Sequence, residues 1–364
     1  MKILILANND IGLYQFRREL IEELLKKNEV VIALPYGELI EPLKKMGCRF
    51  INTPVDRRGI NPFKDLKLML QYMALLKTEA PELVITYTIK PNIYGGMACR
   101  IRKIPYAVNI TGLGTAFQKK GFLRKLVVTL YKQGLKKANL IFFENIENRQ
   151  FFVDQGIAEE KETCVLNGAG VNLKHYQVAE YPTEERGIRF LFIGRVMQEK
   201  GIEELFSAMQ MLQKEAIDCT LDVLGDYEED YKGKMEQYSS EGWLRYHGYQ
   251  KDVRPYIASA HCFVLPSWHE GMANTNLECA AMGRPVITSD IHGCLEAVED
   301  GTTGFLCERK NVEDLHRVMK LFAELSYEEK KQMGLSGRAR METLFDKRMI
   351  VQKTVAELYN HRRN

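Results

Sequence analysis

The sequence predicts an α/β protein made of two doubly wound domains, each built on a parallel sheet. Apolar runs of strand length alternate with segments of helical period along most of the chain, as in successive β-α-β units. The polar stretch 174–187 interrupts this alternation once, and 364 residues exceed what one core usually fills. We therefore expect a first domain over residues 1–173 and a second over residues 187–345, facing each other across a cleft. The last helix, residues 346–364, is expected to pack back on the first domain.

The first domain is expected to bind ligands at one edge of its sheet. Strands are predicted at residues 3–7, 30–34, 50–53, 83–86, 106–110, 140–144 and 163–170, and helices at 14–27, 62–78 and 92–102. The carboxyl ends of parallel strands meet at one edge, where open sheets bind their ligands. The loops 87–92 and 111–115 are therefore expected at that edge. Gly12, before the first helix, either lets a ligand approach the backbone or only forms a turn.

The second domain repeats the alternation. Strands are predicted at residues 190–193, 220–224, 244–246, 262–266 and 285–288, and helices at 202–214, 230–238 and 275–282. Asn274 is predicted to cap the helix 275–282, and Gly283 to end it. Before that helix comes a strand followed directly by a turn. Free backbone amides and the helix dipole favour an anion at such a place.

The composition excludes several classes of protein. Apolar residues make up 45% and charged residues 27% of the chain, as in soluble globular proteins, and a net charge of +3 is too small to indicate nucleic-acid binding. The eight cysteines have no paired or zinc-type spacing and predict reduced core residues of a cytosolic protein. The acidic run 226–230 is better explained as a helix start than as a metal site. We expect no metal, no cofactor and no membrane-spanning helix.

Two carboxylates mark the stretch from Ser267 to Asp290. Glu270 lies in the turn before the helix 275–282, and Glu278 lies within that helix among apolar neighbours. A buried carboxylate needs a partner, which suggests a ligand for Glu278. The alternative is that Glu278 lies on a solvated helix face, as most single glutamates do.

The loop Gly194–Gly201 holds two cations between a strand and a helix start. Arg195 offers a planar fork and Lys200 a point charge, and cations there are poorly placed unless an anion joins them. The loop matches neither the P-loop nor the Gly-x-Gly-x-x-Gly pattern. A nucleotide diphosphate between Arg195, Lys200 and the helix after Glu270 is the simplest shared ligand, and a solvated surface is the alternative.

Residues 117–138 combine basic and apolar side chains without one acidic residue. The cations are Lys119, Lys120, Arg124, Lys125, Lys132, Lys136 and Lys137. Such a helix either lies on an anionic bilayer or buries its apolar stripe in the core and leaves its lysines solvated.

The second domain resembles the retaining glycosyltransferases of family 4, which have the GT-B fold. The matching motifs are Gly194-Arg195 with Lys200-Gly201, Asp222–Gly225, Phe263–Ser267, and Glu270-Gly271 with Glu278 and Gly283–Val286. The resemblance implies that Arg195 and Lys200 hold the donor diphosphate and that Glu270 contacts the donor sugar. Donor-binding residues implied in the same way are Gly12, Gly194, Gly271, Met272, Ala273, Asn274, Tyr249 and Glu278, with Glu278 holding the ribose and Tyr249 near the base.

The loops 86–92 and 109–114 are similar to those of bacterial enzymes that add N-acetylgalactosamine to undecaprenyl-diphosphate sugars. The residues expected on the acceptor side are Lys90, Thr111, Lys119 and Lys120, with Lys90 chosen from its position alone. Many relatives have His-Gly where this chain has Thr111-Gly112, and all seven histidines lie at or beyond His175. A first domain without imidazole agrees with the front-face retaining mechanism that the family implies, in which a leaving phosphate oxygen takes the acceptor proton.

These features together predict a retaining transferase that moves a sugar, N-acetylgalactosamine or another hexose derivative, from a UDP-sugar to a lipid-linked saccharide. It would act in bacterial surface-glycan or glycoprotein-glycan synthesis, from the cytoplasm, as a peripheral protein at the inner face of the plasma membrane. One alternative is a nucleotide-sugar epimerase of similar two-domain shape. Another is a regulator that binds a nucleotide sugar without turnover.

Overall fold

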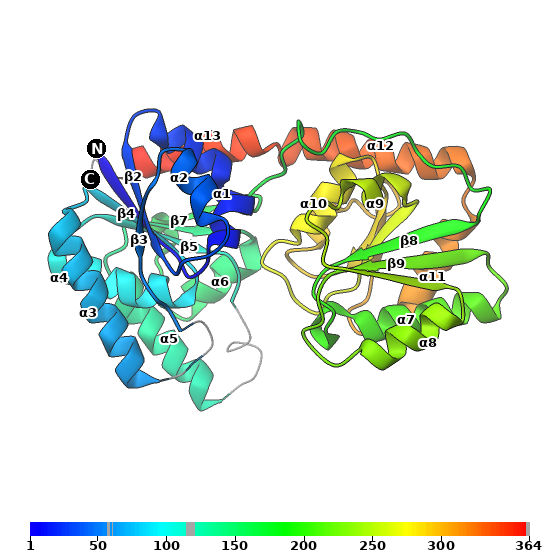
Figure 1. The fold of residues 1–364 in the computed structure, drawn as a ribbon, viewed down its shortest axis with the longest axis horizontal. Helices are drawn as coiled ribbons and strands as arrows, with labels where there is room; N and C mark the ends of the chain where they lie inside the picture. Colours follow the sequence, from blue (N-terminus) through cyan, green and yellow to red (C-terminus); the bar gives the residue numbers. More distant parts are fainter. Residues whose placement is uncertain (57–58, 60, 114–120, 362–364) are drawn as a thin grey trace. The chain divides into compact units, whose positions relative to one another are not determined.

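The chain divides into two compact α/β units, each with helices on both faces of a parallel sheet (Figure 1). The computed structural model describes residues 1–56, 59, 61–113 and 121–361. The first unit comprises Met1–Ala169 together with the chain from Arg348 onward, and the second comprises Gly170–Lys347. The sequence analysis placed these divisions at residues 173, 187 and 345.

The first unit has the strand order β3-β2-β1-β4-β5-β6-β7, with every neighbouring pair parallel. Its strands are β1 (Lys2–Leu6), β2 (Glu29–Leu34), β3 (Arg49–Asn52), β4 (Leu83–Tyr87), β5 (Tyr106–Ile110), β6 (Leu140–Phe143) and β7 (Thr163–Val165). Its helices are α1 (Asp10–Leu25), α2 (Ile40–Lys45), α3 (Pro62–Glu79), the π-helical turn η1 (Pro91–Gly95), α4 (Gly96–Arg102), α5 (Phe122–Leu135), α6 (Ile146–Asp154), the 3₁₀ turn η3 (Glu160–Glu162) and α13 (Lys347–Asn360). The strand order reverses between β1 and β4.

The second unit has the order β10-β9-β8-β11-β12-β13, again parallel throughout. Its strands are β8 (Ile188–Ile193), β9 (Cys219–Leu224), β10 (Leu244–Gly248), β11 (Cys262–Leu265), β12 (Val286–Ser289) and β13 (Gly304–Cys307). Its helices are η4 (Gln198–Lys200), α7 (Ile202–Lys214), α8 (Lys232–Ser240), α9 (Arg254–Ser259), α10 (Asn274–Ala281), η5 (Leu295–Ala297), α11 (Val312–Glu324) and α12 (Tyr327–Leu344). Here the order reverses between β8 and β11.

Most strands are continuous apolar runs because helices cover both faces of each sheet. In the first unit, one core layer lies under α3, α4, α5 and α6, and the other lies under α1, α2 and α13. The last helix joins the first unit through three buried apolar residues, Ile350, Val351 and Leu358. Asn28 also donates a hydrogen bond to the hydroxyl of Tyr359, at 2.9 Å.

Some helix starts differ from the sequence predictions because side chains or loops set them. Helix α1 begins at Asp10 instead of residue 14, since the Asn9 side chain caps it by accepting the Gly12 amide at 2.6 Å. Gly12 therefore lies inside the first helical turn and not in a separate turn. Helix α8 begins at Lys232, so the acidic residues 226–230 form the preceding loop and do not start the helix.

The segment 174–187, which was expected to be a linker, belongs to the second unit and packs on it. Arg284 is 1% exposed and donates hydrogen bonds to the carbonyls of Ala179, at 3.2 Å, and Glu180, at 2.6 Å. The same guanidinium reaches the carbonyls of Ile257 and Ala258. Burial lowers the pKa of Arg284 to about 10. One buried cation thus joins this segment to α9.

We predict that Arg284→Met destabilises the protein, because several buried carbonyl oxygens lose their donor together. The expected loss is about 3 kcal/mol or more in the free energy of unfolding, measured by urea denaturation. Arg317→Met, at an exposed cation paired with Asp314, is the control and should change it by less than about 0.5 kcal/mol. Equal, small effects of both substitutions would contradict the anchoring role.

Candidate functional site

The candidate site lies in the second unit, where the strand order reverses between β8 and β11. In an open parallel sheet, the loops that follow two such strands run to opposite faces and leave a crevice at the carboxyl edge. The loop 194–201 follows β8 and the loop 266–273 follows β11. The cations and the carboxylate that were predicted from the sequence lie on these two loops.

The two loops are held together at their backbones. Gly201 has φ +72°, and a Cβ there would lie 2.0 Å from the carbonyl oxygen of Pro266, so this approach requires glycine. The amide of Trp268 donates to the carbonyl of Glu199 at 2.9 Å. Gly225, after β9, approaches the carbonyl of Gly194 in the same way, which fixes the start of the cationic loop.

An ion pair joins the two loops at their functional side chains. The Lys200 ammonium donates to Oε1 of Glu270, and the Ser267 hydroxyl donates to the same oxygen at 2.8 Å. The Lys200 and Glu270 side chains are largely shielded, with 18% and 12% exposed. The structure thus brings together two residues that lie 70 positions apart in the chain. Ser267, which the sequence analysis gave no role, orients the carboxylate.

The N-terminus of α10 is open. Asn274 was predicted to cap this helix, and that prediction is wrong: Asn274 is the first helical residue, and the cap residue is Ala273, which has no capping side chain. The buried loop residue Ala273 uses its amide to bond the Gly293 carbonyl at 2.7 Å, which fixes the backbone there. No side chain caps the first turn of α10, in which the Asn276 amide donates to the Ala273 carbonyl at 3.0 Å. A helix start without a side-chain cap suits an anion, because amides and the positive end of the helix dipole are left for it.

A second glycine supports the turn that contains Glu270. Gly293 has φ +92°, and a Cβ there would lie 2.7 Å from the carbonyl oxygen of Glu270. Met272 is buried behind the turn, at 5% exposed, and Gly271 is half-buried. The predicted run Gly271 to Asn274 is thus a tightly packed turn that leads from the carboxylate to the helix end.

Arg195 is the more exposed cation of the site. Its guanidinium lies 3.6 Å from Glu228, and 55% of its side chain is exposed. Both Arg195 and Lys200 act electrostatically on His269, as do the carboxylates of Glu199 and Glu270. Burial is the main cause that lowers the pKa of His269, so a neutral imidazole is favoured. The loops after β8 and β11 therefore gather several charges around one ring.

Glu278 lies in α10 and is half-buried, not on a fully solvated face. Burial raises its pKa to about 7, although a hydrogen bond with Tyr176 and the charge of Lys347 act in the opposite direction. Tyr176 was missed by the sequence analysis because it belongs to the segment assigned to a linker. Glu278 is thus a carboxylate whose charge changes near neutral pH.

Tyr249 lies apart from the ion pair. It follows β10, the edge strand, which β9 separates from β8, and it is 56% exposed. Within the described part of the chain, Tyr249 makes no hydrogen bond with Lys200 or Glu270.

In the first unit, two of the predicted acceptor residues, Lys90 and Thr111, lie directly beyond the carboxyl ends of strands, Lys90 in the helical turn before η1 and Thr111 in a loop. Lys90 follows β4 and forms an ion pair of 2.7 Å with Asp65 of α3, whose second carboxylate oxygen accepts a hydrogen bond from Tyr94. Thr111 follows β5 and is half-buried. Lys119 and Lys120 lie outside the residues that the structure describes. Gly12 lies in this unit, in the first turn of α1.

Thr88, also after β4, was not singled out by the sequence analysis. It has φ +73°, a conformation that a β-branched residue rarely adopts. Its hydroxyl and that of Thr86 are buried without a hydrogen-bond partner among the described residues. Strain and unsatisfied polar groups collect at binding sites more often than elsewhere.

The described ranges contain no group of three or more His, Cys, Asp or Glu side chains placed to hold a metal ion. None of the helices in these ranges is both long enough and apolar enough to cross a bilayer.

Two family models match the chain, one in each unit. The model described as "Glycosyl transferase 4-like" matches residues 2–145, and the model described as "Glycosyl transferases group 1" matches residues 187–323. The chain is a two-domain glycosyltransferase. It contains both family domains, and the switch-point loops with Lys200 and Glu270 lie within the group 1 domain.

Relatives of this glycosyltransferase match it over most of its length. The N,N'-diacetylbacillosaminyl-diphospho-undecaprenol alpha-1,3-N-acetylgalactosaminyltransferase of Campylobacter jejuni is 28% identical over 97% of both chains. The UDP-Gal:alpha-D-GlcNAc-diphosphoundecaprenol alpha-1,3-galactosyltransferase of Escherichia coli is 26% identical over 70% of both. Anabaena HepE in complex with UDP-glucose has a TM-score of 0.82 at 18% identity, over 99% of this chain and 100% of that one. The glycosyltransferase therefore has the GT-B fold, as the sequence predicts.

We predict that the pH dependence of stability changes in Glu278→Gln. A folded-state pKa of about 7, raised from 4.5, means that the folded state binds the proton more tightly. The contribution of Glu278 is therefore most favourable below pH 4.5 and is lost as the pH rises through 7. Urea unfolding at pH 5 and pH 8 should show a smaller loss of stability in Glu278→Gln than in the wild type. An identical loss in both proteins would show that Glu278 does not titrate in this range.

Proposed function

We propose that this glycosyltransferase moves a sugar, with retention, from a UDP-sugar to a saccharide linked to undecaprenyl diphosphate. The observation that carries the proposal is the Lys200 and Glu270 ion pair at the switch point, beside the uncapped start of α10. Cations and free amides suit a diphosphate, and the carboxylate suits sugar hydroxyls.

The donor side follows from the chemistry of that site. The diphosphate would lie against the first amides of α10, with Lys200 and Arg195 neutralising its charge. Glu270 would then be free to accept hydrogen bonds from the sugar, and Glu278 from the ribose. The binding of UDP-glucose by HepE, which has the same fold, supports a UDP-sugar as the donor.

The acceptor side rests on the relatives and on the first unit. The Campylobacter and Escherichia relatives are both named for acceptors that contain diphosphate and undecaprenol. N-acetylgalactosamine is the proposed sugar because the Campylobacter enzyme, which matches over the longer span, transfers it. Thr88, Lys90 and Thr111 lie just beyond the carboxyl ends of β4 and β5, which is where the acceptor saccharide and its diphosphate would bind.

The reaction would proceed at one face of the sugar. The bond between the anomeric carbon and the diphosphate oxygen breaks, and the acceptor hydroxyl oxygen bonds to the same face of that carbon. The hydroxyl proton passes to the departing phosphate oxygen, so no protein base is required. The work of the protein is to stabilise the negative charge that develops on this phosphate, by Lys200, Arg195 and the helix end.

The described part of the first unit contains one histidine, His361. The sequence analysis expected no imidazole in the first domain, but His361 belongs to the first unit through α13. Its carbonyl accepts a hydrogen bond from Asn139, which precedes β6 and therefore lies at the amino edge of the sheet. His361 is thus at the edge opposite to the acceptor loops, and it is not proposed as a base.

The direct test is transfer by the purified enzyme. A panel of UDP-hexosamines and UDP-hexoses is offered with an undecaprenyl-diphosphate disaccharide, and products are analysed by mass spectrometry and by anomeric NMR couplings. A single α-linked product from an α-linked donor supports the proposal. Release of free sugar and UDP without acceptor would support the epimerase alternative, and binding of donor without turnover would support the regulator.

We predict that Lys200→Ala and Glu270→Gln each lower kcat/KM for transfer by about 100-fold or more, because each removes a group that acts on the reacting sugar phosphate. Lys200 ends the short turn η4 and Glu270 lies in a loop, and neither side chain belongs to the apolar core, so both variants should still fold and melt cooperatively. Lys320→Ala, which breaks the 2.7 Å ion pair with Glu215 elsewhere in the second unit, is the matched control and should leave kcat/KM unchanged. Wild-type activity in either site variant would remove that residue from its role.

A further inference from the structure

The outer face of α3 is apolar over its first turns. Phe63, Leu66 and Leu70 follow one another at helical spacing and are 84%, 52% and 55% exposed. The opposite side of the same helix is buried in the core through Leu68, Tyr72 and Leu76. A helix on a folded domain normally presents polar residues to water, so a second apolar face indicates an interaction surface.

Helix α4 packs between α3 and α5, and the three form one layer of the first unit (Figure 1). On α5, Val127, Tyr131 and Leu135 are buried, so much of its apolar stripe faces the core. Phe122, at the start of α5, is 82% exposed. The large apolar side chains exposed in this layer are therefore mainly on α3. Helix α4 adds Ile101, which is 50% exposed, and α5 adds Phe122 and Leu123, the latter 38% exposed.

The exposed charges of this layer are almost all positive. Helices α4 and α5 contain no acidic residue, and the acidic residue near the start of α3, Asp65, is turned inward to Lys90 and Tyr94. Lys64 is paired with Asp56 of the preceding loop. The exposed lysines of these helices and of the residues directly after them are Lys64, Lys67, Lys77, Lys103, Lys125, Lys132, Lys136 and Lys137.

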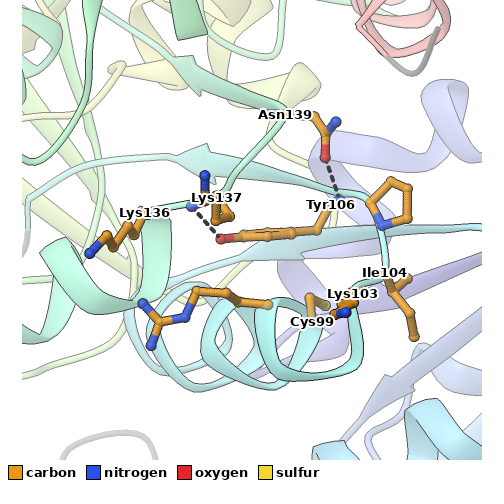
Figure 2. A pocket seen from close by; sticks show the side chains of 9 residues that line it. Cys99, Lys103, Ile104, Tyr106, Lys136, Lys137 and Asn139 are labelled. Carbon is orange, nitrogen blue, oxygen red and sulfur yellow. Dashed lines mark hydrogen bonds between the residues drawn. The ribbon is translucent and has the colours of Figure 1, made fainter. Parts of the chain in front are cut away.

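A cavity of about 560 Å³, also lined by cations, lies between the C-terminal ends of α4 and α5 (Figure 2). Arg100, Lys103, Lys136 and Lys137 line it. The helix dipole favours cations at helix C-termini, which accounts for these side chains without a ligand in the cavity. It extends the positive surface along the layer.

We propose that the face formed by α3, α4 and α5 docks on an anionic bilayer, with Phe63, Leu66 and Leu70 inserted between the headgroups. Exposed apolar side chains on a layer whose exposed charges are almost all positive match the two components of such a surface. A second copy of the chain would present the same cations and be repelled, which argues against a dimer through this face.

This inference rests on the proposed function, because a lipid-linked acceptor has to be reached at a membrane. The structure connects the two: Asp65, on the inner side of α3, holds Lys90 of the predicted acceptor loop. Docking of α3 would thus place the bilayer next to the loop that is proposed to bind the acceptor diphosphate.

The first test uses vesicle co-sedimentation of the full chain. The variant Phe63→Ser/Leu66→Ser/Leu70→Ser is compared with the control Leu321→Ser/Leu335→Ser/Leu344→Ser, whose positions in the second unit are 41%, 41% and 37% exposed. Vesicles contain phosphatidylcholine with roughly 30% phosphatidylglycerol, or phosphatidylcholine alone. The wild type and the control should bind anionic vesicles. The affinity of the α3 variant for these vesicles should be lower by about tenfold or more. Equal binding by the α3 variant and the wild type would overturn the proposal.

Insertion is tested by fluorescence quenching. In Phe63→Trp, lipids brominated on their acyl chains should quench tryptophan emission beyond the level seen in the wild type, whose own tryptophans are Trp243 and Trp268. Binding without additional quenching would mean that α3 does not enter the bilayer, and the proposal would fail.

Two further readouts separate this inference from the proposed function. The α3 variant should transfer sugar to a short-chain, water-soluble acceptor at the wild-type rate, and should lose transfer to an acceptor embedded in vesicles. Vesicle binding by a wild type that transfers no sugar would uphold docking and refute the function. The wild type could instead fail to bind vesicles and sediment as a dimer at equilibrium, while the α3 variant sediments as a monomer. That result would overturn docking and would show that α3 mediates self-association.

Discussion

The ion pair between Lys200 and Glu270 is the interaction on which the donor site depends, and it requires two glycines. The loops after β8 and β11 approach closely only because Gly201 has no Cβ that would clash with the Pro266 carbonyl. Gly293 likewise has no Cβ that would clash with the Glu270 carbonyl. These contacts fix an ammonium and a carboxylate side by side at the topological switch point. The backbone geometry of the loops thus determines where opposite charges meet.

Several local rules of protein structure are broken around the two carboxyl edges. Helix α10 lacks a side-chain cap, and buried oxygens of Asn274, Asn276 and Ser289 have no hydrogen-bond partner in the described chain. In the first unit, Thr88 adopts a left-handed backbone conformation. Departures of this kind lower stability unless a ligand supplies what is missing, and they are expected where a protein binds its substrates.

Much of the fold was predictable from the sequence because buried parallel strands read as apolar runs between amphipathic helices. The cationic loop and the Glu270 turn were also predictable, since both follow such strands directly. Asn274 was misassigned because asparagine favours the cap position, whereas Gly293 and Ala273 fix the real helix start one residue earlier. The hydrogen bond between Tyr176 and Glu278 joins residues about a hundred positions apart, so no local sequence pattern predicts it. Similarly, only the packed structure separates the two apolar faces of α3.

The most direct test of the account is a crystal structure of the enzyme with UDP. We predict that the diphosphate lies against the first amides of α10 and accepts a hydrogen bond from the Lys200 ammonium, which has moved away from Glu270. A diphosphate bound elsewhere, with Lys200 and Glu270 still paired as they are without ligand, would contradict the assignment of the donor site.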